Sequence, residues 1–354
     1  MIKKTIACFF ILNILCALPA LAYVDLTDSW TLANGNLLNL SEEAFSGNLC
    51  WRFEQYAEEG HQTALRRLRL SDGETAVDAV SPGYVIDKNA AEYSGALFAQ
   101  EREDGSVSII HRDWSAPDEV LLEWPAAPGA LMDGNQTIRA FMNGYVYYLA
   151  RTEDGLIHLC RIGADGDTHV YLYARDNIRI IDHYAISIDG KVAYTLIEEE
   201  EATGEWRVSL TIETPDGTRQ SVTNLEGRIP GCMGWLTPDT LILVAENQEE
   251  RVLMGIDAEG TIRPLETADG KTISVRQPPA LGSNLAVSPD GRYVAYLAYV
   301  DTPFYDVYED DDDGVPVILD LTTGKSGYIY DGGRSAGSAL ELRSDFGRIS
   351  WYEP

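Results

Sequence analysis

Short apolar strands alternate with tight polar turns along most of the chain. In the clearest stretch, residues 286–296, Pro-Asp-Gly predicts a turn and the alternating run after Gly291 predicts a half-buried strand. About eleven Asp-Gly dipeptides occur in all, and each is a strong hairpin signal between apolar runs. No segment beyond the first twenty residues predicts an amphipathic helix, so we expect an all-β chain built from hairpins.

The pattern returns about every 50 residues, with intervals of 46 to 56 residues between equivalent turns. Seven copies are marked by the last residue of the first turn: Gly47, Gly95, Gly144, Gly190, Asp239, Gly291 and Gly347. Glycine suits these positions because it adopts a positive φ without steric cost. The third copy predicts four strands, at 137–142, 145–150, 156–162 and 169–173. Four strands per repeat of this length predict the blades of a β-propeller.

The two ends of the chain determine the predicted number of blades. The last copy supplies only two strands, 339–344 and 348–352, and an open two-stranded blade would expose an edge. Residues 23–33 have strand-like composition without a blade of their own. We therefore predict a single seven-bladed propeller of four-stranded antiparallel blades, whose last blade is closed by N- and C-terminal strands. The alternative is six blades with an appended hairpin.

Residues 1–22 predict a bacterial-type secretory signal, with two early lysines, an apolar run at 5–18 and small residues at the cleavage site near Ala22. The propeller domain then comprises residues 23–354. The apolar run is shorter than the roughly 20 residues that span a bilayer, which disfavours the alternative of an uncleaved anchor. Lipid attachment at Cys16 is a second alternative, although Leu15 is larger than such a signal prefers. We expect a secreted, periplasmic or cell-surface protein with no membrane insertion of the mature chain.

The net negative charge of the chain argues against some classes of binding partner. The chain has 27 basic and 56 acidic residues and a net charge of −29. Such a surface repels phosphate backbones and anionic lipids, so we expect no nucleic-acid partner. We expect a monomer that binds a protein or glycan ligand.

Residues that could carry chemistry are scattered. The five histidines show no metal-ligand spacing, and Ser288 lacks the surroundings of a nucleophile elbow. Three cysteines remain after cleavage, Cys50, Cys160 and Cys232; we expect buried free thiols, with one bridge between two of them as the alternative.

One acidic loop has the pattern of a calcium site. Glu309, Asp311 and Asp313, followed by Gly314, alternate as oxygen ligands do in a calcium loop, and Asp320 lies where a closing carboxylate would fall. The first and last ligands depart from the usual residue types. A solvated acidic loop without any cofactor is therefore the default prediction, and calcium is the alternative.

Aromatic side chains suggest a binding site in the same insertion. Phe304, Tyr305 and Tyr308 stand beside charged residues in the longest loop, where exposure is expected. The other tyrosines are predicted to pack between blades.

The motif Ser288–Tyr296 resembles the repeat of the TolB-like and dipeptidyl-peptidase-type propellers, a WD40-like superfamily with PD40 repeats. Weaker copies stand at 187–194 and 143–148. The resemblance implies a propeller that serves as a protein-interaction platform; in the peptidases it gates a separate α/β-hydrolase domain, and no such domain follows residue 354 in this sequence.

We therefore predict a secreted, non-catalytic propeller that binds a protein or glycan. The alternative is an extracellular propeller enzyme of the lyase, glycosidase or lactonase kind, with a site at the central channel. Such a site would need polar side chains from the innermost strands, and the positions concerned are Asp87, Asn135, Asp182 and Glu341.

Overall fold

The computed structural model describes residues 45–353 with several gaps: 58–59, 72–74, 80–82, 89–94, 103–105, 113–116, 125–137, 152–156, 164–167, 172–177, 201–204, 223–224, 226, 281–282, 300–313 and 329–347. The predicted signal at 1–22 and the strand predicted at 23–33 lie outside the described residues. Within the described part, the 24 regular elements are all β-strands. These residues contain no helix with the length and apolar character that a membrane crossing requires.

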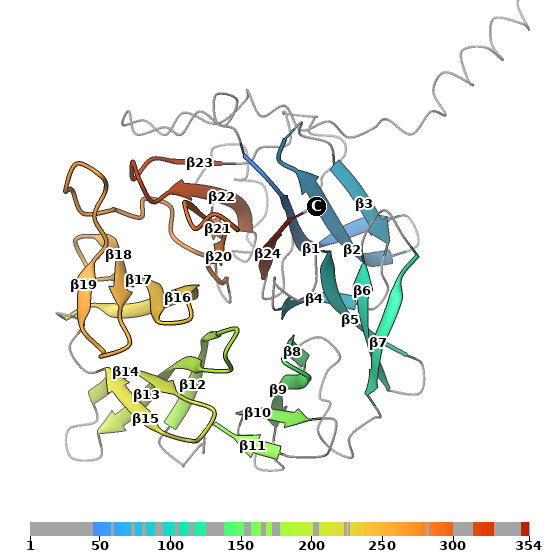
Figure 1. The fold of residues 1–354 in the computed structure, drawn as a ribbon, viewed down its shortest axis with the longest axis horizontal. Helices are drawn as coiled ribbons and strands as arrows, with labels where there is room; N and C mark the ends of the chain where they lie inside the picture. Colours follow the sequence, from blue (N-terminus) through green and yellow to red (C-terminus); the bar gives the residue numbers. More distant parts are fainter. Residues whose placement is uncertain are drawn as a thin grey trace, which may run out of the picture.

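The strands form six four-stranded blades arranged around a centre (Figure 1). Blade 1 contains β24 (Ile349–Tyr352), β1 (Asn48–Ala57), β2 (Gly60–Arg69) and β3 (Thr75–Ala79). Blade 2 contains β4 (Gly83–Lys88), β5 (Ala96–Glu101), β6 (Val107–Arg112) and β7 (Glu119–Trp124). Blade 3 contains β8 (Ile138–Met142), β9 (Tyr145–Arg151), β10 (Ile157–Gly163) and β11 (Thr168–Val170).

The second half of the ring repeats this order, with the innermost strand first in each blade. Blade 4 contains β12 (Ile178–Ile186), β13 (Val192–Glu200), β14 (Glu205–Glu213) and β15 (Arg219–Val222). Blade 5 contains β16 (Ile229–Thr237), β17 (Thr240–Glu246), β18 (Arg251–Ile256) and β19 (Ile262–Pro264). Blade 6 contains β20 (Ala286–Val287), β21 (Tyr293–Tyr299), β22 (Gly314–Asp320) and β23 (Ser326–Tyr328).

The predicted strand β21 shows why an apolar alternating run suits a blade. Successive side chains point to opposite faces of a sheet. Ala295 and Leu297 pack into the cluster shared with blade 1, whereas Val294 and Tyr296 pack into the cluster shared with blade 5. Both faces are therefore buried, and the hydrophobic core lies between blades as a series of layers.

The C-terminal strand closes the ring. β24 pairs antiparallel with β1, so that Ile349 lies opposite Trp51 and Tyr352 opposite Asn48. On its other side, the Ile349 backbone is held by Asn284: the Asn284 amide nitrogen donates to the Ile349 carbonyl at 3.0 Å, and the Ile349 N–H donates to the Asn284 oxygen at 2.9 Å.

This closure explains the blade count. The predicted β-propeller is confirmed, and the described strands form six blades, the alternative, in place of the preferred seven. The predicted pairing of residues 23–33 with the C-terminal strands lies outside the described residues and stays a prediction. The first and seventh copies of the repeat share blade 1, because Gly47 leads into β1 while β24 belongs to the last copy. β24 is thus an innermost strand and not part of an appended hairpin.

Direct contacts between innermost strands join some blades. β4 and β8 pair in parallel at Asp87↔Ala140 and Lys88↔Phe141, which makes blades 2 and 3 one eight-stranded sheet. Between blades 5 and 6, the Leu285 N–H donates to the Met233 carbonyl at 3.0 Å.

The three described cysteines are buried thiols and not disulfides, as predicted: Cys50, Cys160 and Cys232. Burial raises the pKa of Cys160 to about 11 and also raises the pKa of Cys232. At neutral pH both are protonated thiols that pack as small apolar groups.

Candidate functional site at the junction of blades 3 and 4

In blades 2 to 6, the turn between the first and second strands and the turn between the third and fourth strands lie at the same end of the propeller, because neighbouring strands in a blade are antiparallel. We call this end the turn face. The opposite end, which carries the other loops and the connections between blades, is the loop face.

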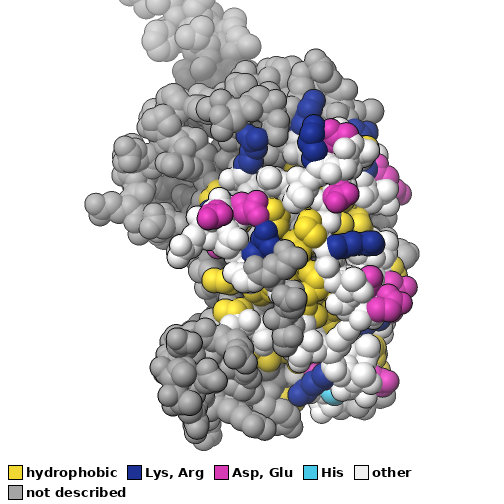
Figure 2. Space-filling view, turned by 90° about the vertical axis from the view of Figure 1, so that its left-hand side faces the viewer, with side chains coloured by type: hydrophobic (Ala, Val, Ile, Leu, Met, Phe, Trp, Pro, Cys, Tyr) yellow, Lys and Arg dark blue, Asp and Glu magenta, His cyan; other side chains and the backbone are white. Residues whose placement is uncertain are grey.

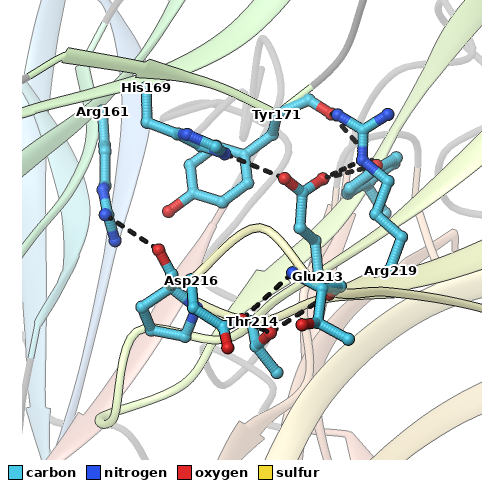
Figure 3. A network of polar contacts seen from close by, with 10 residues as sticks. Arg161, His169, Tyr171, Glu213, Thr214, Asp216 and Arg219 are labelled. Carbon is cyan, nitrogen blue, oxygen red and sulfur yellow. Dashed lines mark hydrogen bonds and ion pairs between the residues drawn. The ribbon is translucent and has the colours of Figure 1, made fainter.

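A polar network on the turn face joins blade 3 to blade 4 (Figure 3). Its centre is Glu213, the last residue of β14, whose side chain is fully buried. The Glu213 carboxylate bonds to His169 Nε2 at 2.8 Å and accepts from the Tyr194 hydroxyl at 3.0 Å and from Arg219 Nε at 2.9 Å. His169 belongs to β11 of blade 3, so a buried carboxylate of one blade is satisfied partly by its neighbour.

The local sequence around Glu213 explains its position. Glu213 and Arg219 are opposite one another in the β14–β15 ladder, on either side of the turn Thr-Pro-Asp-Gly-Thr. Asp216 closes this turn: it accepts from the Thr214 hydroxyl at 2.5 Å and from the Thr218 N–H at 3.0 Å. The hydrogen bond from Thr214 is the main cause of the lowered pKa of Asp216. The turn therefore holds the Glu213 carboxylate beside the Arg219 guanidinium at the end of the β14–β15 ladder.

The Tyr194 hydroxyl stays protonated in this setting. Burial raises its pKa, and the nearby charge of Glu213 raises it further, against the smaller opposite effect of Arg219. The hydroxyl is also 3.0 Å from the Tyr171 carbonyl, and Arg219 Nη2 donates to the same carbonyl at 3.3 Å. The end of β11 is thus held by two side chains of blade 4.

A second cation, Arg161, lies in the same junction among aromatic rings. Its guanidinium carbon is 4.7 Å from the Tyr145 ring centre and 5.9 Å from the Tyr171 ring centre, within cation–π range. Arg161 Nη2 donates to the Pro215 carbonyl of the blade 4 turn at 3.2 Å. The Tyr171 ring in turn stacks against Tyr147, with 6.1 Å between the ring centres.

Turns of successive blades also bond directly to one another. Asn143, in the blade 3 turn, has a positive φ of 54° and donates from its amide to the Ile188 carbonyl of the blade 4 turn. Lys191 continues the series by donating to the Pro238 carbonyl of the blade 5 turn at 2.8 Å and pairing with Asp239 at 2.8 Å. The turn face of blades 3, 4 and 5 is therefore one connected surface.

Most of the sequence-predicted site residues lie outside this junction. The predicted aromatic site and three of the four predicted calcium ligands fall outside the described residues: Phe304, Tyr305, Tyr308, Glu309, Asp311 and Asp313. Asp320 is described and is fully buried at the end of β22. Its carboxylate accepts from Arg292 Nη2 at 2.9 Å and from the Thr322 N–H at 2.7 Å, so it already holds a turn of blade 6.

The positions considered for a channel enzyme are likewise dispersed or undescribed. Asp87 lies on β4 and Asp182 on β12, both innermost strands, while Asn135 and Glu341 are outside the described residues. Within the described part of the chain, no three His, Cys, Asp or Glu side chains are grouped so that they could hold a metal ion.

Sequence reasoning missed the junction because its members are far apart in the chain. Glu213 is 44 residues from His169 and meets it only when two blades stack. The available signal was the pair Glu213 and Arg219 across a Thr-Pro-Asp-Gly-Thr turn, since opposite charges there face each other on adjacent strands.

Comparison with family models finds no match to this chain. A search of curated proteins finds no match either. Among solved structures, TolB from Acinetobacter baumannii is similar over 88% of this chain and 67% of its own, with a TM-score of 0.54 and 12% identity. The β-propeller domain of the Trilobed protease from Pyrococcus furiosus is similar over 78% of this chain and 93% of its own, with a TM-score of 0.45 and 9% identity.

A puromycin-hydrolyzing peptidase from Mycobacterium tuberculosis is similar over 90% of this chain but only 55% of its own, with a TM-score of 0.44 and 14% identity. The chain has the fold of TolB-type propellers. The resemblance of the 288–296 motif is therefore confirmed at the level of the fold. The Glu213 network and the connected turns lie on the turn face of this propeller.

Proposed function

We propose that the chain is a secreted, periplasmic or cell-surface β-propeller that binds a protein or glycan partner through its turn face, without catalysis. The observation that carries the proposal is the set of hydrogen bonds between turns of successive blades, from Asn143 to the Ile188 carbonyl and from Lys191 to the Pro238 carbonyl. A surface that is already ordered loses less conformational entropy when a partner binds.

The same turns also expose an apolar side chain. Ile188 is 44% exposed, which is high for a large apolar side chain, and its own carbonyl is held by Asn143. Lys191 and Asp239 lie nearby in the connected turns and form an ion pair. An apolar contact surrounded by polar groups is the usual arrangement of a binding surface.

Charge distribution is compatible with a polar partner. On the side shown in Figure 2, basic and acidic side chains are interspersed around a strip of apolar ones, although the whole chain carries a net charge of −29. The proposed location rests on the secretory signal predicted at 1–22. The proposal requires no cofactor and no oligomer.

A pair of matched variants tests the proposal. Ile188→Asp places a charge on the turn face, and Ile229→Asp, at the start of β16 and 52% exposed, places the same charge on the loop face. The full chain would be expressed in cells and cross-linked, and captured proteins and arrayed glycans would be compared. We expect Ile188→Asp alone to lose a partner that the unchanged chain holds, while circular dichroism shows both variants folded.

Two outcomes would contradict the proposal. Equal binding by both variants would show that the contact lies away from the turn face, and loss in Ile229→Asp alone would place it on the loop face. Repeating the binding with a calcium chelator tests the loop at 309–320: a partner that binds only with calcium would assign a cofactor. Mass spectrometry of the mature N-terminus tests cleavage near Ala22.

A further inference from the structure

Tyr184, on the innermost strand of blade 4, contacts arginines of two other blades. The guanidinium carbon of Arg348 is 4.4 Å from the centre of the Tyr184 ring, and that of Arg139 is 5.7 Å from it. Both distances are within cation–π range. Arg348 directly precedes β24 of blade 1, and Arg139 belongs to β8 of blade 3. One aromatic ring therefore connects the inner edges of three blades.

The contact between Arg348 and Tyr184 crosses the centre of the propeller. Blades 1 and 4 are on opposite sides of the ring, so their innermost strands, β24 and β12, face each other across the axis (Figure 1). Two side chains from these strands that meet at 4.4 Å must do so close to the axis. The residues are buried there: Arg139 and Arg348 are each 6% exposed, and Tyr184 is 3% exposed. Side chains therefore fill the centre of the ring at this level.

Irregular pairing in two innermost strands occurs at these same residues. In β8 the register with β9 shifts between Ile138 and Ala140, so that Arg139 is the extra residue of a bulge. In β12 the register with β13 shifts between Ile180 and Tyr184, and Tyr184 is the first residue paired after the irregularity. A bulge bends its strand and redirects the side chains beside it. The backbones of β8 and β12 thus depart from regular pairing where their side chains reach other blades.

The buried setting makes these contacts stronger than the same contacts on a surface. A cation–π interaction gains strength when water is excluded from the charge and the ring. An arginine also keeps its charge at every ordinary pH, so the interaction does not depend on protonation. Arg161 over the Tyr145 ring, at 4.7 Å, is the same kind of contact within one blade and connects no other strand of the ring.

We propose that Arg348, Tyr184 and Arg139 form a tie across the propeller axis that holds the closing strand β24 to blades 3 and 4. β24 is then fixed from three directions: by pairing with β1, by the hydrogen bonds of Asn284, and from the far side of the ring. The same tie fixes β12, whose following turn carries Ile188. The tie closes the axis at its own level, and it is independent of the partner proposed for the turn face.

Hydrogen exchange of the full chain, followed by mass spectrometry, tests the tie. Tyr184→Leu keeps an apolar side chain and removes the ring, so exchange in the segment 348–353 should become about 5- to 30-fold faster, the effect of losing buried cation–π contacts. Tyr184→Phe keeps the ring, so its exchange in that segment should stay close to that of the unchanged chain. The readout lies on the opposite side of the ring from the substitution, where a purely local disturbance of blade 4 would not reach.

Two further variants complete the experiment. Tyr145→Leu is the matched control, because it removes the ring from a cation–π contact that stays within blade 3. Its exchange in the segment 348–353 should be unchanged. Arg348→Met is the reciprocal variant: it keeps the apolar stem, removes the charge and should speed exchange of β12, across the ring. Combining Arg348→Met with Tyr184→Leu should add little to either effect, because both remove the same contact.

Each outcome decides for or against the tie. Faster exchange at 348–353 in Tyr184→Leu, without it in Tyr184→Phe and Tyr145→Leu, would support the proposal. Unchanged exchange at 348–353 in Tyr184→Leu would overturn it. Equal acceleration in Tyr145→Leu would show a general loosening of the fold and would overturn it as well. If Tyr184→Leu does not fold, exchange of β12 in Arg348→Met decides the question: acceleration supports the tie, and unchanged rates overturn it.

Discussion

Asn284 should be a main support of the closed ring, and Asn284→Ala tests this. The residue is 7% exposed, and its amide makes two hydrogen bonds to the Ile349 backbone, at 3.0 and 2.9 Å. Removing it leaves a buried N–H and a buried carbonyl on β24 without their partners. Each such group costs about 1–3 kcal/mol, so we expect the free energy of unfolding to fall by about 2–6 kcal/mol.

The assay is urea unfolding followed by circular dichroism, with Asn247→Ala as the matched control. Asn247 likewise makes two hydrogen bonds to the backbone, accepting both from the Glu249 and Glu250 N–H groups, but it lies on an exposed turn where water can replace them. Hydrogen exchange of the segment 348–353 should also become faster in Asn284→Ala. If both variants lose the same small amount of stability and exchange is unchanged, the closing strand does not depend on Asn284.

Three further predictions concern backbone, charge and thiols. Gly47→Ala should lower the melting temperature far more than Gly144→Ala. Both glycines have a positive φ, but only at Gly47 would an added Cβ lie 2.6 Å from a backbone oxygen of β24. Burial acts to raise the pKa of Asp320, but the hydrogen bonds from Arg292 and the Thr322 N–H and the charge of Arg292 together lower it below its usual value. The stabilisation that ionised Asp320 contributes is therefore present above the unfolded pKa of about 3.9 and is lost as pH falls through the folded value. We expect Asp320→Asn to flatten the acid side of a curve of unfolding free energy against pH. An unchanged slope would contradict this. Cys160, with a pKa of about 11, should resist alkylation at pH 8 until urea unfolds the chain, and fast labelling of the native protein would refute its burial.

Much of the fold could be predicted because each hairpin is specified locally. Gly144, Gly190 and Gly291 were predicted as turn residues, and each has a positive φ between the first two strands of a blade. The blade count depended on a different kind of information. Pairing of β24 with β1 joins residues about 300 positions apart, and no local pattern states whether the first and last copies form two blades or share one.

The candidate site was harder to predict for the same reason. The turn that places Glu213 beside Arg219 is visible in the sequence, but the approach of His169 depends on how blades 3 and 4 stack. In the sequence Arg161 is an ordinary strand residue, because its hydrogen bond to the Pro215 carbonyl reaches a turn of the next blade, 54 residues away. Contacts between repeats are specified by the shapes of whole blades and not by spacing within one repeat.

The two junctions of blade 3 differ in how freely their sequences can vary. Blades 2 and 3 are joined by main-chain pairing of β4 with β8, and backbone hydrogen bonds are the same for almost every amino acid. Blades 3 and 4 are joined by particular side chains, above all His169 and Glu213, for which few substitutes exist. Substitutions that preserve side-chain size should therefore be accepted readily between blades 2 and 3. Between blades 3 and 4, a single substitution of His169 or Glu213 should be enough to weaken the contact.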